Sequence, residues 1–319
     1  MSTAIETTGL CYSASKEFAI RDLSLKVPAG ALYGFLGPNG CGKTTTIRLL
    51  LGLLRPDSGS VHLLGHSVPG DLPRALAKTG VVPDRPHLHR YLSVREAIAF
   101  HRAFYQAWDA KWAGELLGEF RLQPQQKISG LSKGESAKLT LLLALCQTPD
   151  LLVLDEPMDG LDPVVRRDVL SALLDYVARR GATVFISSHL VHELERFCDW
   201  IGVMDRGRLV VELPMNEFRG GNKRIRFTSV GPVESAGAPF TLLNRDRDTA
   251  TETWVVRGWR PDMSAWFERP GLTVREVTDL DLEDGFVELL RAFRAQEARE
   301  TPCSKRSCGF SGREAGTSW

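Results

Sequence analysis

The sequence predicts an α/β fold in which helices cover a mixed, largely parallel sheet. The first observation is a series of short apolar strands, such as 151–155 and 183–187, separated by segments with helical spacing. Such strands are near-continuous runs of Leu, Val and Ile because both faces of the sheet are buried. The second observation is a change of pattern after Pro214, which predicts a smaller α+β unit in the last third of the chain.

The first forty residues predict an N-terminal antiparallel β subdomain. AIETTGLCY and FAIRDLSLKV alternate apolar with polar positions, and a turn at 28–30 precedes the strand ALYGFLG. From Thr44 the apolar spacing becomes helical, and the turn at Pro56 ends that helix. A strand, a glycine-rich loop and a helix therefore follow one another.

The middle of the chain predicts a helical subdomain at about 91–146. Helical spacing begins near Ser93, which can cap that helix, and Asp109 can cap the next. A further helix begins at about Lys133, and another is predicted for 163–180, between the strands LLVLD and TVFIS. Helices that alternate with buried strands complete an α/β layer architecture.

These patterns divide the chain into three parts. Residues 1–214 form the main α/β domain, and 215–295 form a C-terminal α+β extension with three β-like runs and one helix. Asp279 or Asp281 can cap that helix, LEDGFVELLRAFRA. Residues 296–319 are rich in Ser, Gly, Arg and Thr, a composition typical of a disordered tail.

The composition excludes several classes of protein. Hydrophobic content of 43% and charged content of 25% are those of a globular chain. The 40 basic and 39 acidic residues leave a formal charge of +1, which gives no general attraction to nucleic acid or to an anionic membrane. No apolar run approaches the roughly 20 residues of a membrane span, and the N-terminus lacks a secretory signal. We therefore expect a cytoplasmic protein.

The segment from Gly37 to Thr44, GPNGCGKT, fits the phosphate-loop pattern G-x-x-x-x-G-K-[ST]. A strand leads into it and a helix leads out, which is the context that such a loop requires. Its backbone N–H groups can surround a polyphosphate, and the helix N-terminus adds positive potential. Lys43 can reach the terminal phosphates, and the Thr44 hydroxyl can ligate Mg²⁺. A glycine-rich turn that binds nothing is the alternative.

The apolar strand LLVLD ends in two acidic residues, Asp155 and Glu156. Its end lies at the carboxyl edge of the sheet, where ligands bind in open α/β folds. There Asp155 can hold Mg²⁺ and Glu156 can polarise an attacking water. Together with the phosphate loop, this strand predicts a P-loop nucleotide hydrolase.

Between these two motifs, Leu-Ser-Lys-Gly-Glu stands at 131–135, where a predicted helix begins. Here the chain resembles the ATP-binding-cassette (ABC) family, whose signature reads LSGGQ, and the resemblance covers about residues 3–213. By this resemblance Tyr12 matches the aromatic residue that stacks on adenine, and Asp162 closes the D-loop, DGLD. His189 matches the switch histidine that contacts the γ-phosphate.

The resemblance implies ATP and Mg²⁺ as ligands. The residues expected in catalysis are Glu156, His189 and Lys43, and those expected to hold Mg²⁺ are Thr44, Asp155 and Asp84. The residues expected to contact the nucleotide are Tyr12, Gly37, Pro38, Asn39, Gly40, Cys41, Gly42, Lys43, Thr44, Thr45, Asp84, Ser132, Gly134 and Asp162.

Two departures from the family pattern concern this site. Asp84 stands where the family has the Q-loop glutamine, so it can offer oxygen to Mg²⁺ or water but adds negative charge beside the γ-phosphate. The signature has Lys133 and Glu135 in place of Gly and Gln, while Ser132 and Gly134 remain. Lys133 either adds positive charge to that phosphate or is solvated. Neither departure removes a catalytic group, so we expect an active ATPase.

The resemblance also implies partners. A complete site takes the phosphate loop of one cassette and the signature of another, so it implies a second cassette subunit, most simply a homodimer closed head-to-tail around two ATP. A transport subunit without a span needs a separate polytopic permease, which would hold it at the inner face of the cell membrane. The segment VTDLDLEDGFVELL resembles the extension of drug and polysaccharide exporters. The alternative is a soluble cassette protein that acts on nucleic acid or ribosomes, for which no basic surface or added module is found.

Cys41 lies inside the phosphate loop near a helix N-terminus, which would lower the pKa of its thiol. We therefore expect alkylation to block ATP hydrolysis and prior MgATP to protect. The 6 cysteines form no CxxC pair, so they are expected to be free thiols of a reducing compartment.

Overall fold

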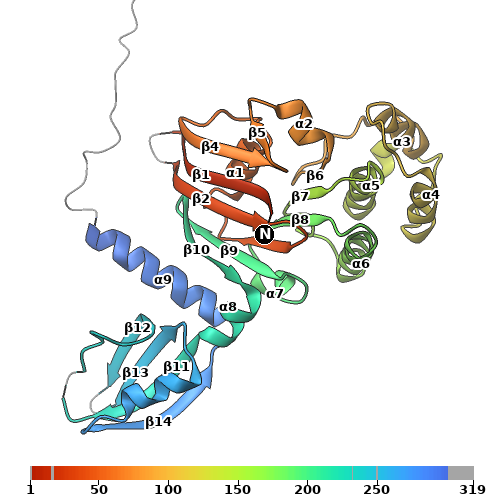
Figure 1. The fold of residues 1–319 in the computed structure, drawn as a ribbon. Coiled ribbons are helices and arrows are strands. Elements are labelled where there is room, and N and C mark those ends of the chain that lie inside the picture. The colour runs from red at the N-terminus through yellow and green to blue at the C-terminus, as the bar shows by residue number, and fades with distance from the viewer. Residues whose placement is uncertain (1, 16–17, 232, 249–250, 301–319) are drawn as a thin grey trace, which may run out of the picture. The chain divides into compact units, whose positions relative to one another are not determined.

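The computed structural model describes residues 2–15, 18–231, 233–248 and 251–300. The chain forms two compact units that divide after Arg219 (Figure 1). The sequence analysis placed this division at Pro214, the last residue of a strand, and the short helix α8, Met215–Gly221, spans the boundary.

A six-stranded mixed sheet forms the centre of the first unit. Its strand order is β10-β9-β3-β8-β7-β6. The strands span Leu32–Leu36 (β3), Thr79–Val82 (β6), Leu151–Asp155 (β7), Thr183–Ser188 (β8), Trp200–Asp205 (β9) and Arg208–Pro214 (β10). All neighbours are parallel except β10 and β9, which are antiparallel. The prediction of a mixed, largely parallel sheet is confirmed, and the carboxyl ends of β3, β7 and β8 lie at one edge.

An antiparallel sheet of four strands forms the N-terminal subdomain, as predicted. Its order is β2-β1-β4-β5. The strands span Thr3–Ser13 (β1), Ala19–Pro28 (β2), Ser58–Leu63 (β4) and His66–Val68 (β5). Its inward residues, such as Ile5 and Leu23, pack with Phe35 and Phe185 of the large sheet in one continuous core. The helix α1, Lys43–Leu50, contacts β4 of this sheet and β7 of the large sheet, and α2, Leu72–Ala77, packs against β5.

The predicted helical subdomain consists of α3, Val94–Arg102, α4, Ala110–Glu119, and α5, Lys133–Cys146. Ser93 and Asp109 cap α3 and α4 as expected from the sequence, because each side chain accepts a hydrogen bond from a free backbone N–H of the first turn. The helices α6, Pro163–Arg180, and α7, Val191–Leu194, follow β7 and β8. Among the described residues, no helix is long and apolar enough to span a bilayer.

The second unit is a four-stranded antiparallel sheet with the order β12-β13-β11-β14. Its strands span Lys223–Ser229 (β11), Thr241–Asp248 (β12), Thr251–Arg257 (β13) and Leu272–Asp279 (β14). Ile225, Phe227 and Trp254 pack with the 3-10 helix Pro261–Phe267 in an aromatic core. The α+β extension is confirmed, although β12 was not predicted, because its sequence TLLNRDRD is mostly polar.

The helix α9, Leu282–Glu300, ends the described chain. Asp281 caps it, since its Oδ1 accepts a hydrogen bond of 2.7 Å from the Asp284 N–H. The helix includes 296–300, which the sequence analysis assigned to the tail. The rest of that predicted tail, 301–319, lies outside the described residues.

Candidate nucleotide-binding site

The phosphate loop connects β3 to α1, and two of its glycines are required by geometry. Gly42 directly precedes α1 with a φ of 119°, which side chains other than glycine rarely adopt. A Cβ on Gly37 would stand 2.4 Å from the carbonyl oxygen of Met204, so no larger residue fits beneath the loop. The glycine pattern therefore builds a tight turn whose N–H groups and helix terminus can receive an anion.

Lys43, the first residue of α1, lies almost fully buried within this loop. Its Nζ donates a hydrogen bond of 2.6 Å to the Gly37 carbonyl and a longer one of 3.4 Å to that of Pro38. It also lies 3.0 Å from the Glu156 Oε1, an ion pair without the alignment of a hydrogen bond. One buried ammonium thus joins the loop to the residue that follows β7.

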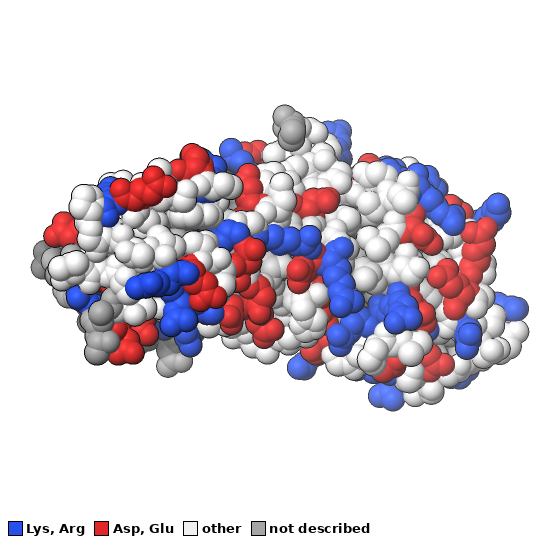
Figure 2. Space-filling model, turned by 90° about the horizontal axis from the view of Figure 1, so that it is seen from below, with Lys and Arg blue, Asp and Glu red and all other residues white. Residues whose placement is uncertain are grey.

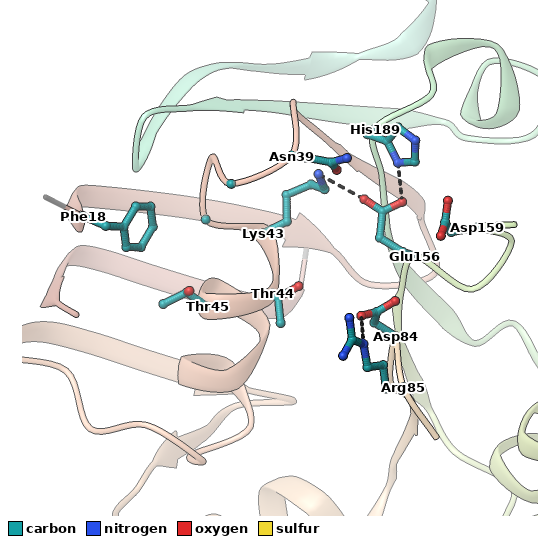
Figure 3. A pocket seen from close by; sticks show the side chains of 12 residues that line it. Phe18, Asn39, Lys43, Thr44, Thr45, Asp84, Arg85, Glu156, Asp159 and His189 are labelled. Atoms are coloured by element: carbon teal, nitrogen blue, oxygen red, sulfur yellow. Dashed lines mark hydrogen bonds and ion pairs between the residues drawn. The ribbon is translucent and has the colours of Figure 1, made fainter. Parts of the chain in front are cut away.

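Glu156 is placed between Lys43 and His189 (Figure 3). Its backbone has a φ of 47°, and its N–H donates a 2.9 Å hydrogen bond to the Ser187 hydroxyl of β8. The His189 Nδ1 lies 2.9 Å from the Glu156 Oε2, so a proton on Nδ1 is donated to that carboxylate. A left-handed backbone at a carboxylate costs free energy, and such strain is concentrated at functional sites.

A cavity of about 530 Å³ lies over the loop, within the size range of small-molecule sites. Its lining residues are Phe18, Asn39, Gly40, Gly42, Lys43, Thr44, Thr45, Asp84, Arg85, Glu156, Asp159 and His189. The three residues expected in catalysis are thus brought together at one cavity. Gly37, Pro38 and Cys41 belong to the loop without lining the cavity.

The aromatic residue at this cavity is Phe18 rather than Tyr12. Both side chains are partly buried against the core of the first unit, but only Phe18 is among the lining residues. Sequence analysis did not select Phe18, which directly precedes β2 and comes close to Gly42 of the loop only in the folded chain, so no local pattern marks it. The assignment of Tyr12 to the adenine therefore stays a prediction, and Phe18 is a second candidate for stacking.

The three residues expected to hold Mg²⁺, Thr44, Asp155 and Asp84, all carry oxygen donors, and their contact with the ion stays a prediction. The Thr44 hydroxyl and the Ser187 hydroxyl both donate to Asp155, the latter at 2.7 Å. Asp84 lines the same cavity as Thr44 (Figure 3). Among the described residues, no group of three or more His, Cys, Asp or Glu could hold a metal alone. These hard oxygens therefore fit a cation that completes its shell with phosphate oxygens and water, as Mg²⁺ does.

The electrostatic environment of Asp155 is consistent with a cation site. Burial raises the pKa of its carboxyl above the usual value, and hydrogen bonds from Ser187 and Thr44 oppose that shift. The negative charges of Asp84 and Glu156 raise the pKa further. Because these carboxylates repel each other, a divalent cation would relieve the repulsion.

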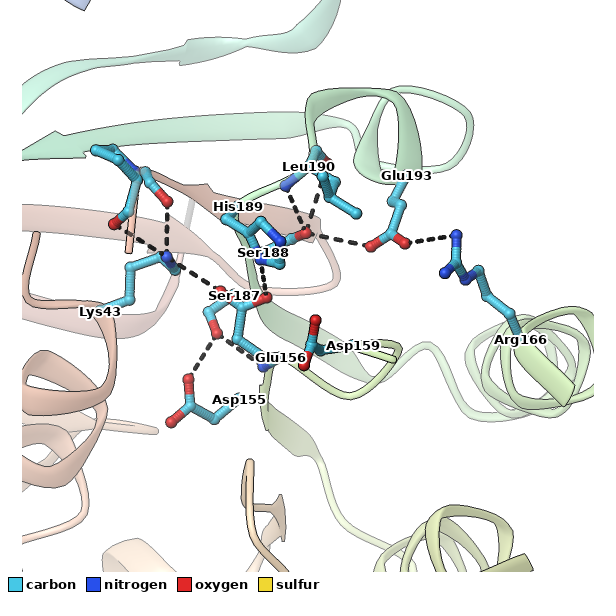
Figure 4. A network of polar contacts seen from close by, with 12 residues as sticks. Lys43, Asp155, Glu156, Asp159, Arg166, Ser187, Ser188, His189, Leu190 and Glu193 are labelled. Atoms are coloured by element: carbon cyan, nitrogen blue, oxygen red, sulfur yellow. Dashed lines mark hydrogen bonds and ion pairs between the residues drawn. The ribbon is translucent and has the colours of Figure 1, made fainter. Parts of the chain in front are cut away.

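A second polar network supports the segment that carries His189 (Figure 4). The Ser188 hydroxyl accepts from the Leu190 N–H at 3.0 Å and donates to the Glu193 Oε2 at 3.2 Å. The other Glu193 oxygen forms an ion pair of 2.9 Å with Arg166 of α6. Sequence analysis did not find this network, which ties the histidine segment to the helix that follows the D-loop.

The signature and D-loop residues have structural roles in the single chain. Ser132 caps α5 in a reciprocal capping box with Glu135, and the Asp162 carboxylate caps α6 by accepting from Val164 and Val165. The Lys133 ammonium lies 3.8 Å from Asp159 and is mostly exposed. Among the described residues, Ser132, Gly134 and Asp162 are absent from the lining of the cavity. Their contact with a nucleotide stays a prediction.

The expected low pKa of Cys41 is wrong. Burial raises the pKa of this thiol to about 11, and the opposing effect of Lys43 is smaller. The loop encloses the sulfur beneath Gly37, so the side chain is 4% exposed rather than facing the cavity. Sequence alone located the helix terminus but not the burial that outweighs it.

Alkylation of Cys41 in the native protein is therefore expected to be slow. At pH 8 its thiolate population is roughly 100-fold below that of a free thiol, before burial further limits access. The measurement is mass spectrometry of the Cys41 peptide during treatment with N-ethylmaleimide, with the denatured chain as the control. Modification of native Cys41 as fast as in the denatured chain would contradict the buried position.

The fold and the site together define a P-loop nucleotide-binding cassette, and comparison with known proteins identifies its family. A sequence model of the ABC transporter family matches residues 20–159. The bacitracin transport ATP-binding protein BcrA of Bacillus licheniformis is 33% identical over 303 residues, which cover 91% of this chain and 98% of that protein. The chain belongs to the family of ABC transporter ATP-binding subunits, and it is an ATP-binding subunit of such a transporter.

Further relatives agree with this assignment. The Nod factor export ATP-binding protein I of Burkholderia lata is 41% identical over 201 residues, 61% of this chain and 66% of that protein. A solved structure described as the ATP-binding subunit of an ABC transporter is 27% identical, with a TM-score of 0.62, and covers 68% of this chain and 92% of its own. The predicted P-loop cassette fold is confirmed.

Proposed function

We propose that this chain hydrolyses ATP and thereby powers export through a separately encoded membrane permease. The observation that carries the proposal is the position of Glu156, which lies at the cavity between the loop lysine and the switch histidine. A phosphate that enters the loop competes with Glu156 for Lys43, and this competition frees the carboxylate to face water. The ion pair between Lys43 and Glu156 is then the resting arrangement of the site.

In the proposed reaction, water attacks the γ-phosphorus, the bond between that phosphorus and the β–γ bridging oxygen breaks, and ADP and phosphate leave. Glu156 orients the water and accepts its proton, while His189 holds the carboxylate and can contact the γ-phosphate. Mg²⁺ held by Thr44, Asp155 and Asp84 would neutralise charge on the phosphate oxygens. Lys43 stabilises the negative charge of the same phosphates.

A head-to-tail dimer of two cassettes around two ATP would complete this site. Support comes from Ser132 and Gly134, which remain from the family signature although they do not line the chain's own cavity. A second copy would present these groups to the γ-phosphate of the first. The closing force is then the differential affinity of ATP for the closed dimer.

Export is supported by the name of one relative, a Nod factor export subunit, and transport by the name of another, a bacitracin transport subunit. No helix among the described residues is long and apolar enough to span a bilayer. The proposed path for the substrate is a separately encoded permease. The chain would then be peripheral at the inner face of the cell membrane.

An aromatic surface formed by α3 and the segments on either side of it is the proposed docking site for the permease. We define it as His89, Tyr91, Phe100 and Phe104, of which Tyr91 and Phe104 are 71% and 70% exposed. Ring centroids of Phe100 and Phe104 are 5.1 Å apart, and His89 lies 5.3 Å from Phe100. Phe104 also lines an adjacent cavity of about 520 Å³. Clustered exposed aromatic residues are typical of interfaces, and the proposed occupant is a short amphipathic helix of the permease.

Replacing both Tyr91 and Phe104 by Ser is expected to weaken the complex with the permease about tenfold or more, because each loses an anchor of the aromatic surface. The measurement is co-purification of a polytopic protein in detergent from the native host. Leu53→Ser is the matched control, since Leu53 is 70% exposed elsewhere on the first unit. ATP binding should stay unchanged in all three proteins, and an intact complex with the double variant would contradict this docking site.

The same co-purification tests transport against action on nucleic acid or ribosomes. On the face drawn in Figure 2, Lys and Arg side chains gather across the middle, but acidic side chains lie directly beside them, which agrees with the formal charge of +1. A surface that binds nucleic acid would gather Lys and Arg without acidic neighbours. A detergent-dependent complex with a polytopic protein supports the proposal, whereas a salt-sensitive complex with RNA would replace it by the alternative.

A further inference from the structure

We propose that two copies of this chain associate, without nucleotide, through the free edge of the sheet in the second unit. That edge is β14, which pairs with β11 on one side and, among the described residues of its unit, with no strand on the other (Figure 1). An edge strand presents unpaired N–H and C=O groups, which form a template for a further strand. The proposed occupant is a second β14 in antiparallel orientation.

The sequence of β14 is complementary to itself. Residues 273–278 read Thr-Val-Arg-Glu-Val-Thr. If a two-fold axis passes between Arg275 and Glu276, each Thr or Val faces a residue of the same type in the other copy, and each charged residue faces one of opposite charge. In this register Thr273 faces Thr278, Val274 faces Val277 and Arg275 faces Glu276 of the other copy. A two-fold contact repeats each pair, so it contains two Arg–Glu pairs and two Val–Val pairs.

The observed sheet places these side chains on the faces that the pairing needs. Val277 lies opposite Ile225 and Val274 opposite Phe227, two residues of the aromatic core. Opposed residues of antiparallel strands share a face, so both valines lie on the core side of the sheet. A regular strand would put residues three apart on opposite faces, but a register shift opposite Arg226 and Phe227 brings them to one face.

The valines remain exposed at this edge, at 40% for Val274 and 44% for Val277. In the two-fold pairing the four valines of two copies would meet and extend the apolar core of each sheet. Burial of these side chains supplies the apolar part of the association.

The charged side chains of β14 can also accept a partner from a second copy. Arg275 is exposed and makes no ion pair within the described part of the chain. Glu276 lies 3.5 Å from Arg226 of the neighbouring strand, with both side chains about half exposed. A carboxylate can accept from two guanidinium groups, so the second copy's Arg275 would extend this pair into a row of alternating charges.

A charge exchange between two variants tests this register. Arg275→Glu places Glu opposite Glu twice, and Glu276→Arg places Arg opposite Arg twice. The dissociation constant of the dimer should therefore rise at least about tenfold in each variant alone. A mixture of the two restores an opposite charge at every position. The mixture should form a heterodimer that is tighter than the homodimer of either variant.

The measurement is sedimentation velocity of the full chain in EDTA without nucleotide, over roughly 1–100 µM, the range suited to a small interface. Glu283→Arg and Arg299→Glu make the same charge changes on the exposed side of α9 and should leave dimerisation unchanged. Emission of the buried Trp254 and Trp266 reports whether the second unit stays folded in each variant.

Bulges and charged side chains can also protect a sheet edge from pairing. If they do so at β14, the chain stays monomeric and the charge exchange has no effect. Wild-type protein that stays monomeric at every concentration would overturn the proposal. So would a mixture of the two variants that dimerises no better than each alone. ATP-driven closure of the cassettes is measured separately, with nucleotide present, so failure of one dimer leaves the test of the other intact.

Discussion

Glu156→Gln is expected to lower the rate of ATP hydrolysis about 10²- to 10⁴-fold, the usual contribution of a positioned general base. The amide keeps the shape of the side chain but cannot accept the proton of water. It also ends the ion pair with Lys43, so nucleotide binding should be unchanged or tighter. A dimer that holds ATP without cleaving it should therefore accumulate, measured by single-turnover hydrolysis and by size-exclusion chromatography with MgATP.

Glu96→Gln is the matched control for this substitution. Glu96 also accepts hydrogen bonds, from Ser93 in the capping box of α3, and Gln can replace Glu in such a box. The control thus removes one negative charge from the same unit without touching the cavity. Normal turnover by Glu156→Gln would show that this residue is not the base, and loss of turnover in Glu96→Gln would point to a general effect of charge.

The parts of the site that sequence predicted are those encoded locally. The phosphate loop is a continuous segment whose glycines, lysine and threonine are fixed by the geometry of one turn, so pattern and structure agree. The strand that ends in Asp155 and Glu156 is likewise one apolar run, and its place at the edge follows from parallel pairing. The same reasoning predicted the caps at Ser93 and Asp109, because capping acts within three residues.

The parts that sequence missed depend on contacts between distant segments. Ser187 binds both Asp155 and the Glu156 N–H from a neighbouring strand, and Glu193 meets Arg166 across two helices. No spacing in the chain marks such pairs. Burial is equally nonlocal, and for this reason the pKa of Cys41 was predicted in the wrong direction.

The polar edge strand β12 shows a third limit of sequence analysis. Strand prediction rests on apolar alternation, and β12 alternates little because most of its side chains are exposed at the edge of the sheet. Its pairing with β13 is carried by the backbone, together with the Arg245–Glu252 contact of 3.0 Å. Backbone hydrogen bonding depends little on the type of side chain, so this strand could be identified only from the structure.

Lys43→Ala is expected to lower the affinity for ATP, whereas Glu156→Gln lowers the rate of hydrolysis and leaves ATP binding intact. The ammonium is the buried cation at the base of the loop, and charge-assisted contacts to phosphate account for about a 10- to 100-fold difference in affinity. ATP turnover should fall with binding and should not recover fully at saturating ATP, because the same charge stabilises the transition state. The measurement is isothermal titration with ATP, followed by steady-state hydrolysis.

Lys138→Ala separates this charge effect from a loss of folding. Lys138 is also a buried lysine, 8% exposed, and its Nζ lies 2.6 Å from Asp168 on α6, away from the cavity. Both truncations leave a carboxylate without its cation, so both should lower the melting temperature. Only Lys43→Ala should weaken ATP binding. If Lys138→Ala weakens ATP binding equally, the loss reflects general destabilisation, and Lys43 has no special role at the phosphate. If Lys43→Ala binds ATP normally, the loop does not hold the nucleotide through its lysine.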